Sequence, residues 1–150
     1  MRKALAALAV LAVGLTAAGV AIAAGGQGIT ATQKIHFAWT IQHTNAFVNG
    51  QAPAPGDVSY FAGPIARDGH KAGAFRASCT SVAPERGECV GTLVTADGNI
   101  QLAGSVGFDR STDWFAVTGG TQKYSNVRGD VKSHNRRSGN KIDFFITLLP

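Results

Sequence analysis

The chain has 150 residues, of which 15% are charged and 19 are glycine. This length leaves room for one domain and excludes a second hydrophobic core, and the composition is typical of an all-β domain with many tight turns. The formal charge of +5 falls to about +3 without the two basic residues near the N-terminus, so the charge alone does not indicate a nucleic-acid-binding protein.

The first 24 residues have the pattern of a signal peptide. Arg2 and Lys3 form a basic start, residues 4–20 are apolar, and Ala21-Ile22-Ala23 matches a cleavage site. The alternative is an uncleaved membrane anchor, because the apolar stretch is long enough to span a bilayer. We favour cleavage, since alanine and glycine make the stretch weakly apolar. The sequence therefore predicts a secreted protein that has no stable membrane insertion after cleavage.

Eight strand-like runs follow in residues 25–150, which we predict to be a single domain. The dipeptides Asp68-Gly69 and Asp97-Gly98 lie between such runs, and Asp-Gly in that position favours a hairpin turn. The predicted strands are residues 33–43, 57–66, 72–82, 88–95, 99–108, 114–118, 126–134 and 141–149. Eight strands with tight turns predict an all-β fold, a single eight-stranded antiparallel up-and-down β-barrel.

Both faces of the last predicted strand carry apolar side chains. Ile142, Phe144, Ile146 and Leu148 alternate with Asp143, Phe145, Thr147 and Leu149. In a barrel the inward set fills or lines the interior, and an apolar outward set is typical of packing against another subunit. We therefore expect a homo-oligomer.

Cys79 and Cys89 are the two cysteines of the chain. An even number of cysteines in neighbouring strands of an exported protein predicts a disulfide. The alternative is a reactive thiol or a metal ligand, but the chain has no C-x-x-C motif and no histidine at metal-like spacing.

Other motifs of catalysis or cofactor binding are missing. The four histidines do not form a zinc signature, no serine lies in a G-x-S-x-G elbow, and the segment 119–123 lacks the spacing of a phosphate loop. Basic residues gather around Ser138-Gly139-Asn140 without interleaved aromatic residues that would stack on bases. We expect no metal, no organic cofactor and no nucleic-acid partner.

Aromatic side chains that face a barrel interior would form a cavity for an apolar or planar ligand. Polar side chains nearby would orient such a ligand. The aromatic candidates for this cavity are Trp39, Tyr60, Phe61, Phe75, Phe108, Trp114 and Phe115, and Asp57, Arg76 and Tyr60 are the polar ones. From these we select Trp39, Tyr60, Phe61, Trp114, Asp57 and Arg76 as site residues. The alternative is that the aromatic residues only fill the core, because an eight-stranded barrel is near the size at which the interior is either filled or holds one small ligand.

The segment 115–131 reads F-A-V-T-G-G-T-Q-K-Y-S-N-V-R-G-D-V. Gly119 and Gly120 permit a turn with positive φ, Thr121 can cap a short helical turn, and Gly129 leaves space where strand pairing resumes. This order resembles the V-T-G-G-T-G-x-Y-x-x-A-R-G-x-V signature of allene oxide cyclase-like and dirigent-like proteins, and Arg128 matches its arginine. It differs at two positions, where Gln122 replaces the third glycine and Val127 replaces the alanine.

The resemblance extends over about residues 35–148 and implies the eight-stranded antiparallel barrel of that family. Gly56-Asp57-Val58, Ala72-Gly73 and Ser78-Cys79 are similar to further family motifs. Allene oxide cyclases close a ring in a fatty-acid epoxide by holding its conformation, and dirigent proteins orient reactive phenolic intermediates. The resemblance therefore implies a cyclase or isomerase that needs no cofactor.

The family's reacting groups do not carry over well. Where cyclases have a glutamate and an asparagine, residues 33–56 contain no acidic residue, and Asn45 is the nearest equivalent. Cys79 matches the family cysteine, and Ala62-Gly63-Pro64 and Ala74 stand where dirigent proteins have aspartates and an arginine. Three functions follow from the sequence: a barrel that binds a small apolar or aromatic ligand, a conformation-directing cyclase or isomerase, or a structural barrel with a filled core.

Overall fold

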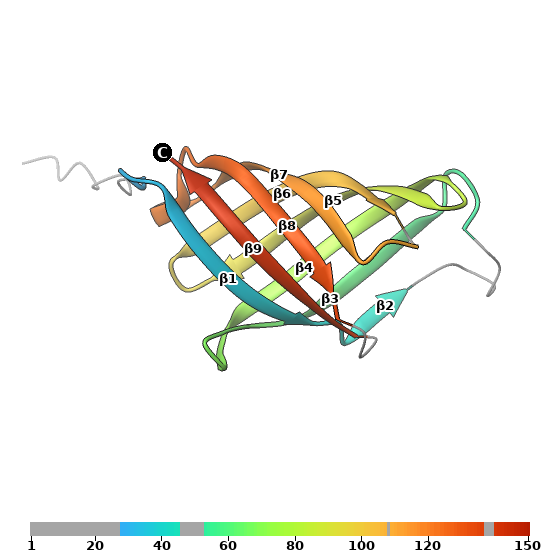
Figure 1. Cartoon of the computed structure of the whole chain (residues 1–150), viewed down its shortest axis with the longest axis horizontal. Helices are drawn as coiled ribbons and strands as arrows, with labels where there is room; N and C mark the ends of the chain where they lie inside the picture. Colours follow the sequence, from blue (N-terminus) through green and yellow to red (C-terminus); the bar gives the residue numbers. More distant parts are fainter. Residues whose placement is uncertain (1–27, 46–52, 108, 137–139) are drawn as a thin grey trace, which may run out of the picture.

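One antiparallel sheet closes on itself to form the barrel of Figure 1. The computed structural model describes residues 28–45, 53–107, 109–136 and 140–150. Its strand order is β1-β9-β8-β7-β6-β5-β4-β3-β2, and β1 also pairs with β3. The strands are β1 (Gln33–Thr40), β2 (His43–Asn45), β3 (Val58–Arg67), β4 (His70–Ala83), β5 (Arg86–Thr95), β6 (Gly98–Gly107), β7 (Thr112–Gly120), β8 (Arg128–Asn135) and β9 (Lys141–Leu149). The predicted all-β, eight-stranded barrel is confirmed. The predicted signal peptide lies outside the described residues.

The barrel closes where β1 and β2 meet β3. Trp39 of β1 is paired with Ile65 of β3, and His43 of β2 is paired with Ala62 further along the same strand. The predicted first strand, residues 33–43, is therefore interrupted at Ile41 and Gln42. β1 and β2 lie along the same edge of β3 and together occupy one strand position in the barrel. The nine strands therefore form an eight-stranded barrel.

Two short turns set the register of the hairpins. Asp68 and Gly69 connect β3 to β4 with φ angles of 52° and 79°, and two positive φ angles in a two-residue loop match the twist of the flanking strands. Asp97 lies in the loop between β5 and β6, and Gly98 begins β6 with a φ of 131°. Both predicted Asp-Gly turns are confirmed.

The predicted helical turn is present as the 3-10 helix η1 (Gln122–Tyr124), but the predicted cap is wrong. Thr121 occupies the N-cap position without a side-chain hydrogen bond to the helix. Its Oγ1 instead accepts a hydrogen bond of 3.0 Å from the backbone N–H of Asn99 on β6. Thr121 therefore ties the turn after β7 to the neighbouring strand. Within the described ranges, no helix is long and apolar enough to cross a membrane.

The disulfide between Cys79 and Cys89 is present, as predicted. The two residues are direct partners in the pairing of β4 with β5, and both are buried, with 7% and 4% of their surface exposed. A bond that closes so short a loop stabilises the fold by about 2–3 kcal/mol, because it restricts the unfolded chain.

The two ends of the barrel differ in how they are filled. We call the end at which β1 begins and β9 ends the closed end; Figure 1 shows the C-terminus there. Near this end Ile29, Tyr124 and Val127 are buried, with at most 9% exposed, and belong to the same apolar core as Leu148 of β9. Apolar side chains therefore pack continuously here. We call the opposite end, at which β1 ends and β9 begins, the open end.

Candidate ligand-binding cavity

The interior contains a cavity of about 220 Å³ towards the open end. Aromatic rings form much of its wall. The ring of Phe75 lies edge-on to Trp39, with centroids 4.8 Å apart, and edge-on to Phe144 at 4.9 Å. The cavity is lined by Trp39, Ile41, Phe61, Phe75, Ala77, Cys79, Cys89, Val90, Gly91, Val106, Gly107, Arg110, Asp113, Phe115, Ser133, Asn135, Ile142 and Phe144. The cavity thus offers a planar apolar group several aromatic contacts.

Small residues on β4 and β5 leave room for this cavity. Ala77, the disulfide of Cys79 and Cys89, and Gly91 line it where larger side chains would fill the interior. A Cβ atom at Gly91 would lie only 2.5 Å from the ring of Phe75. Since a real Cβ never approaches so closely, glycine at this position allows the Phe75 ring to lie against the strand.

Polar groups from β7, β8 and the preceding loop lie on the other side of the cavity. Asp113 Oδ1 accepts a hydrogen bond of 2.9 Å from the backbone N–H of Gly107. The hydroxyl of Ser133 donates to the backbone carbonyl of Asp113 at 3.3 Å, and Arg110 also lines the cavity. The Gly107 N–H thus holds the Asp113 carboxylate, and Ser133 holds the backbone of Asp113, beside the aromatic rings. A few fixed polar groups in an apolar cavity are typical of sites that orient a small molecule.

The indole N–H of Trp39 has no hydrogen-bond partner among the residues that the structure describes. Trp39 is 4% exposed, and a buried donor without an acceptor costs about 1–3 kcal/mol. The Nε1 atom lies near Gly63 of β3, where an added Cβ would be 3.0 Å away. Trp39 therefore combines a ring on the cavity with an unsatisfied donor beside the neighbouring strand.

The sequence candidates divide between the inside and the outside of the barrel. Trp39 and Phe61 line the cavity. Tyr60 and Trp114 are each 58% exposed, and Arg76 is also exposed on the outer surface. Asp57 precedes β3, where its carboxylate accepts a hydrogen bond from the N–H of Ala54 at 2.9 Å. The structure thus brings two of the six candidates together at the cavity.

Side-chain alternation explains this division. Consecutive residues of a strand point to opposite faces, so Tyr60 points outward because Phe61 points inward. Phe75 and Phe115, aromatic candidates outside the six selected residues, also line the cavity, and Phe108 lies outside the described residues. The sequence pattern gave no indication of Asp113, Ser133 and Phe144 as site residues. The predicted disulfide indicates the inward face of β4. Cys79 points inward, and every second residue before it on the strand, Ala77 and Phe75, lies on the same face.

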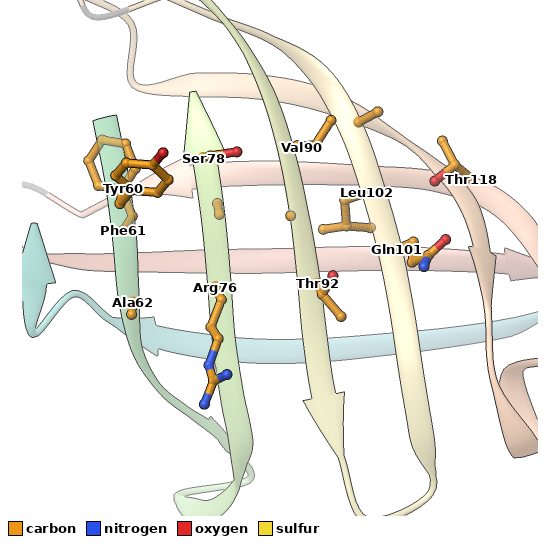
Figure 2. Close-up of a pocket in the computed structure, with 13 residues that line it drawn as sticks. Tyr60, Phe61, Ala62, Arg76, Ser78, Val90, Thr92, Gln101, Leu102 and Thr118 are labelled. Carbon is orange, nitrogen blue, oxygen red and sulfur yellow. The ribbon is translucent and has the colours of Figure 1, made fainter. Parts of the chain in front are cut away.

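Tyr60 and Arg76 instead lie together in an open groove of about 660 Å³ on the outer surface of β3 to β7. Figure 2 shows Tyr60, Arg76, Thr92 and Gln101 on successive strands. The exposed valine Val90, with 59% of its surface accessible, also borders this groove. Ala62, Ser78 and Ala103 are small and leave the surface hollow. This face carries exposed apolar side chains, whereas the outward apolar residues predicted on the last strand, Phe145 and Leu149, lie on β9 outside this groove.

An ion cluster on the outside of the barrel joins Arg136, just after β8, to Asp143 of β9. Arg136 donates two hydrogen bonds to Asp143, from Nε to Oδ2 at 2.6 Å and from Nη2 to Oδ1 at 2.5 Å. His36 Nε2 lies 2.9 Å from the same Oδ1 atom. The hydrogen bonds from Arg136 lower the pKa of Asp143, burial opposes this effect, and the hydrogen bond with His36 lowers the pKa further.

This cluster predicts an acid-sensitive contribution to stability. A carboxyl with a lowered pKa in the folded state stabilises the fold above its unfolded pKa of about 3.9, and the contribution is lost as the pH falls through the folded pKa. Urea unfolding of Asp143→Asn at several pH values should therefore lack part of the decline seen in the wild type below about pH 4. Asp130→Asn, which changes an exposed carboxyl on β8, is the control. Equal pH profiles for wild type and Asp143→Asn would contradict this assignment.

Solved structures of other proteins contain a similar barrel. No family model and no curated protein sequence matches the chain. Among solved structures, a pyocyanin demethylase matches with a TM-score of 0.68 and 20% identity, over 78% of this chain and 100% of that one. The pterocarpan synthase dirigent protein PsPTS1 matches with a TM-score of 0.62 and 19% identity, over 80% and 96%.

A further solved structure extends the group to cyclases. A nonspecific heme-binding cyclase that catalyses a cycloaddition in neoabyssomicin biosynthesis matches with a TM-score of 0.65 and 16% identity, over 78% of this chain and 63% of that one. The chain therefore has the dirigent-like, allene oxide cyclase-like barrel fold that its glycine motif predicted. At these sequence identities the structural similarity shows a shared fold. The reactions named above are those of the matched proteins.

Proposed function

We propose that this barrel binds a small apolar or aromatic molecule in the cavity at its open end. The observation that carries this proposal is the cavity of about 220 Å³ with aromatic walls and a fixed carboxylate. Pockets for drug-sized ligands span about 300–1,000 Å³, so the ligand is smaller, a molecule of one or two rings. Structural neighbours named for pyocyanin demethylation and pterocarpan synthesis support a ligand-handling interior.

The two tryptophans provide a direct test of ligand binding. In Trp114→Phe the remaining tryptophan, Trp39, lines the cavity, whereas in Trp39→Phe the remaining tryptophan lies on the outer surface. Titration with small planar phenols and quinones should quench the fluorescence of Trp114→Phe saturably, because a bound ring contacts the Trp39 indole. The same titration should leave Trp39→Phe nearly unchanged. Quenching of Trp39→Phe alone would place the ligand outside the barrel and contradict the proposal.

A conformation-directing cyclase or isomerase is the alternative function, and Asp113 favours it. Its carboxylate lies in the cavity and is held by the Gly107 N–H, so it can orient a hydroxyl group or accept a proton from a bound intermediate. An enzyme of this kind needs only a few polar groups, since the cavity walls select the reactive conformation. Conversion of a bound ligand by wild type but not by Asp113→Asn would favour this alternative over binding alone. A purely structural barrel is disfavoured by the cavity itself.

We also propose that the mature protein is secreted and forms a homo-oligomer. The signal-peptide pattern of residues 1–24 and the disulfide support export, because disulfides persist in oxidising compartments. The exposed Tyr60 and Val90 of the outer groove support self-association. Size-exclusion chromatography with light scattering should give a multiple of the subunit mass, and Val90→Lys should shift it towards the monomer. A wild-type monomer at high concentration would contradict the oligomer.

A further inference from the structure

A separate groove of about 340 Å³ crosses the outer surface of β1, β9, β8 and β7. Strand pairing brings together residues that are far apart in the sequence: His36 lies beside Phe145, Phe145 beside Lys132, and Lys132 beside Trp114. All four point outward, since Phe37 and Phe144, their neighbours along β1 and β9, are buried inside. We call this row, with Lys34, Asp130 and Thr147 beside it, the outer aromatic groove.

The aromatic rings of this groove are exposed but held in place. Trp114 is 58% exposed and Phe145 is 48% exposed. The ring of His36 stacks on Phe145 with centroids 4.8 Å apart and an interplanar angle of 16°, and His36 itself is fixed by Asp143. Lys132 Nζ lies 6.0 Å from the centre of the Trp114 ring. The groove is therefore an ordered surface before any ligand binds, which reduces the entropy lost on binding.

The polar groups of the groove include both donors and acceptors. Lys34, Asp130 and Thr147 lie on neighbouring strands, because Thr147 of β9 is paired with Lys34 on one side and with Asp130 on the other. Among the described residues, neither Lys34 nor Asp130 has an ion-pair partner in the structure. With Lys132, the ammonium groups outnumber the carboxylates. A ligand that fits must therefore present apolar faces, hydroxyl groups and some negative charge.

We propose that the outer aromatic groove binds an acidic polysaccharide. Sugar rings present C–H faces to Trp114 and Phe145, hydroxyl groups to Asp130 and Thr147, and uronate carboxylates to Lys34 and Lys132. Four adjacent strands span roughly 14 Å, which is longer than one sugar ring and fits a short stretch of chain. A single-stranded DNA backbone has no hydroxyl donors for Asp130, whereas every ring of a polyuronate presents hydroxyl groups.

The test uses tetragalacturonate as the probe and isothermal titration calorimetry of the disulfide-bonded protein. Trp114→Ala and Phe145→Ala should each weaken binding by about tenfold, the effect of one lost ring contact in such a site. Lys132→Gln should weaken it by a similar factor, and its remaining affinity should depend less on salt. Val82→Ala is the control, because Val82 of β4 is 47% exposed and lines neither outer groove; it should bind like the wild type.

Other ligands distinguish the remaining outcomes. Neutral cellotetraose should bind more weakly than tetragalacturonate, and equal affinity would overturn the acidic assignment. Tighter binding of a single-stranded oligothymidylate would identify a nucleic-acid surface instead. Equal loss of affinity in Trp114→Ala and Val82→Ala, or no binding heat with tetragalacturonate, would also overturn the proposal. If light scattering shows that Trp114→Ala dissociates an oligomer of the wild type, this face is a subunit interface and the polysaccharide site is excluded.

Discussion

Gly63→Val is expected to lose about 3 kcal/mol or more of unfolding free energy, as overpacking in a closed interior can. An added Cβ at Gly63 would lie 1.9 Å from the carbonyl oxygen of Thr40 and 3.0 Å from Trp39 Nε1. These atoms belong to β1, which closes the barrel by pairing with β3. The side chain would therefore push the two strands apart at the seam. Urea unfolding followed by far-UV circular dichroism measures the loss.

Ala62→Val is the matched control for this substitution. Ala62 precedes Gly63 on β3 and borders the open outer groove, so two added methyl groups have space there. Its unfolding free energy should stay within about 0.5 kcal/mol of the wild type, as for most surface changes. Full stability of Gly63→Val would show that β1 and β3 do not approach as closely as the structure has them.

Phe144→Ala is expected to lose about 3–5 kcal/mol, the range measured when a buried aromatic ring is removed. Phe144 is 2% exposed and contacts both Phe75 and Trp39, with ring centroids 4.9 and 5.8 Å away. Its removal leaves a hole beside the existing cavity, so the lost contacts are not replaced. Chemical unfolding monitored by Trp39 fluorescence in the Trp114→Phe background measures both the loss of stability and the change in the cavity.

Phe145→Ala is the control, because it removes a phenylalanine from the outer face of the same strand, β9. Phe145 is 48% exposed and stacks on His36 outside the barrel. The substitution Phe145→Ala should lower the unfolding free energy by about 1 kcal/mol or less. If both substitutions cost the same, the inward assignment of Phe144 is wrong, because a one-residue change of register exchanges the two faces of a strand.

The fold was predictable from local signals that agree with one another. Asp68-Gly69 and Asp97-Gly98 mark turns that the structure contains, and the paired glycines after Val117 carry the family resemblance that the solved structures support. Glycines in this segment also prevent steric clashes: a Cβ at Gly120 would lie 2.4 Å from the carbonyl oxygen of Tyr124. Such constraints act on the backbone and require glycine, so they can be recognised in the sequence itself.

The candidate site was harder to predict, because it depends on which face of each strand points inward. Tyr60 and Phe61 are adjacent and both aromatic, yet one is 58% exposed and the other lines the cavity. Asp113 was missed for a different reason. The predicted strand began at Trp114, whereas β7 begins at Thr112, so Asp113 belongs to the strand and its side chain turns into the barrel.

Long-range pairing also creates surfaces that no stretch of sequence displays. Lys132 has no Phe, Tyr or Trp neighbour in the chain between Val127 and Asn135, but the sheet places it between Trp114 and Phe145. Because these residues lie far apart in the sequence, no single segment could predict the outer aromatic groove.

Whether the ligand site lies inside the barrel can be tested with the two indole N–H resonances in a ¹H–¹⁵N correlation spectrum. Trp114→Phe assigns them, since one resonance disappears. On titration with a small planar phenol, we expect saturable shifts of the Trp39 indole and of the backbone amides of Gly91, Gly107 and Asp113, which line the cavity. The Trp114 indole should not move. Shifts confined to Trp114 or to the outer residues Ser78, Thr92 and Gln101 would contradict an interior site.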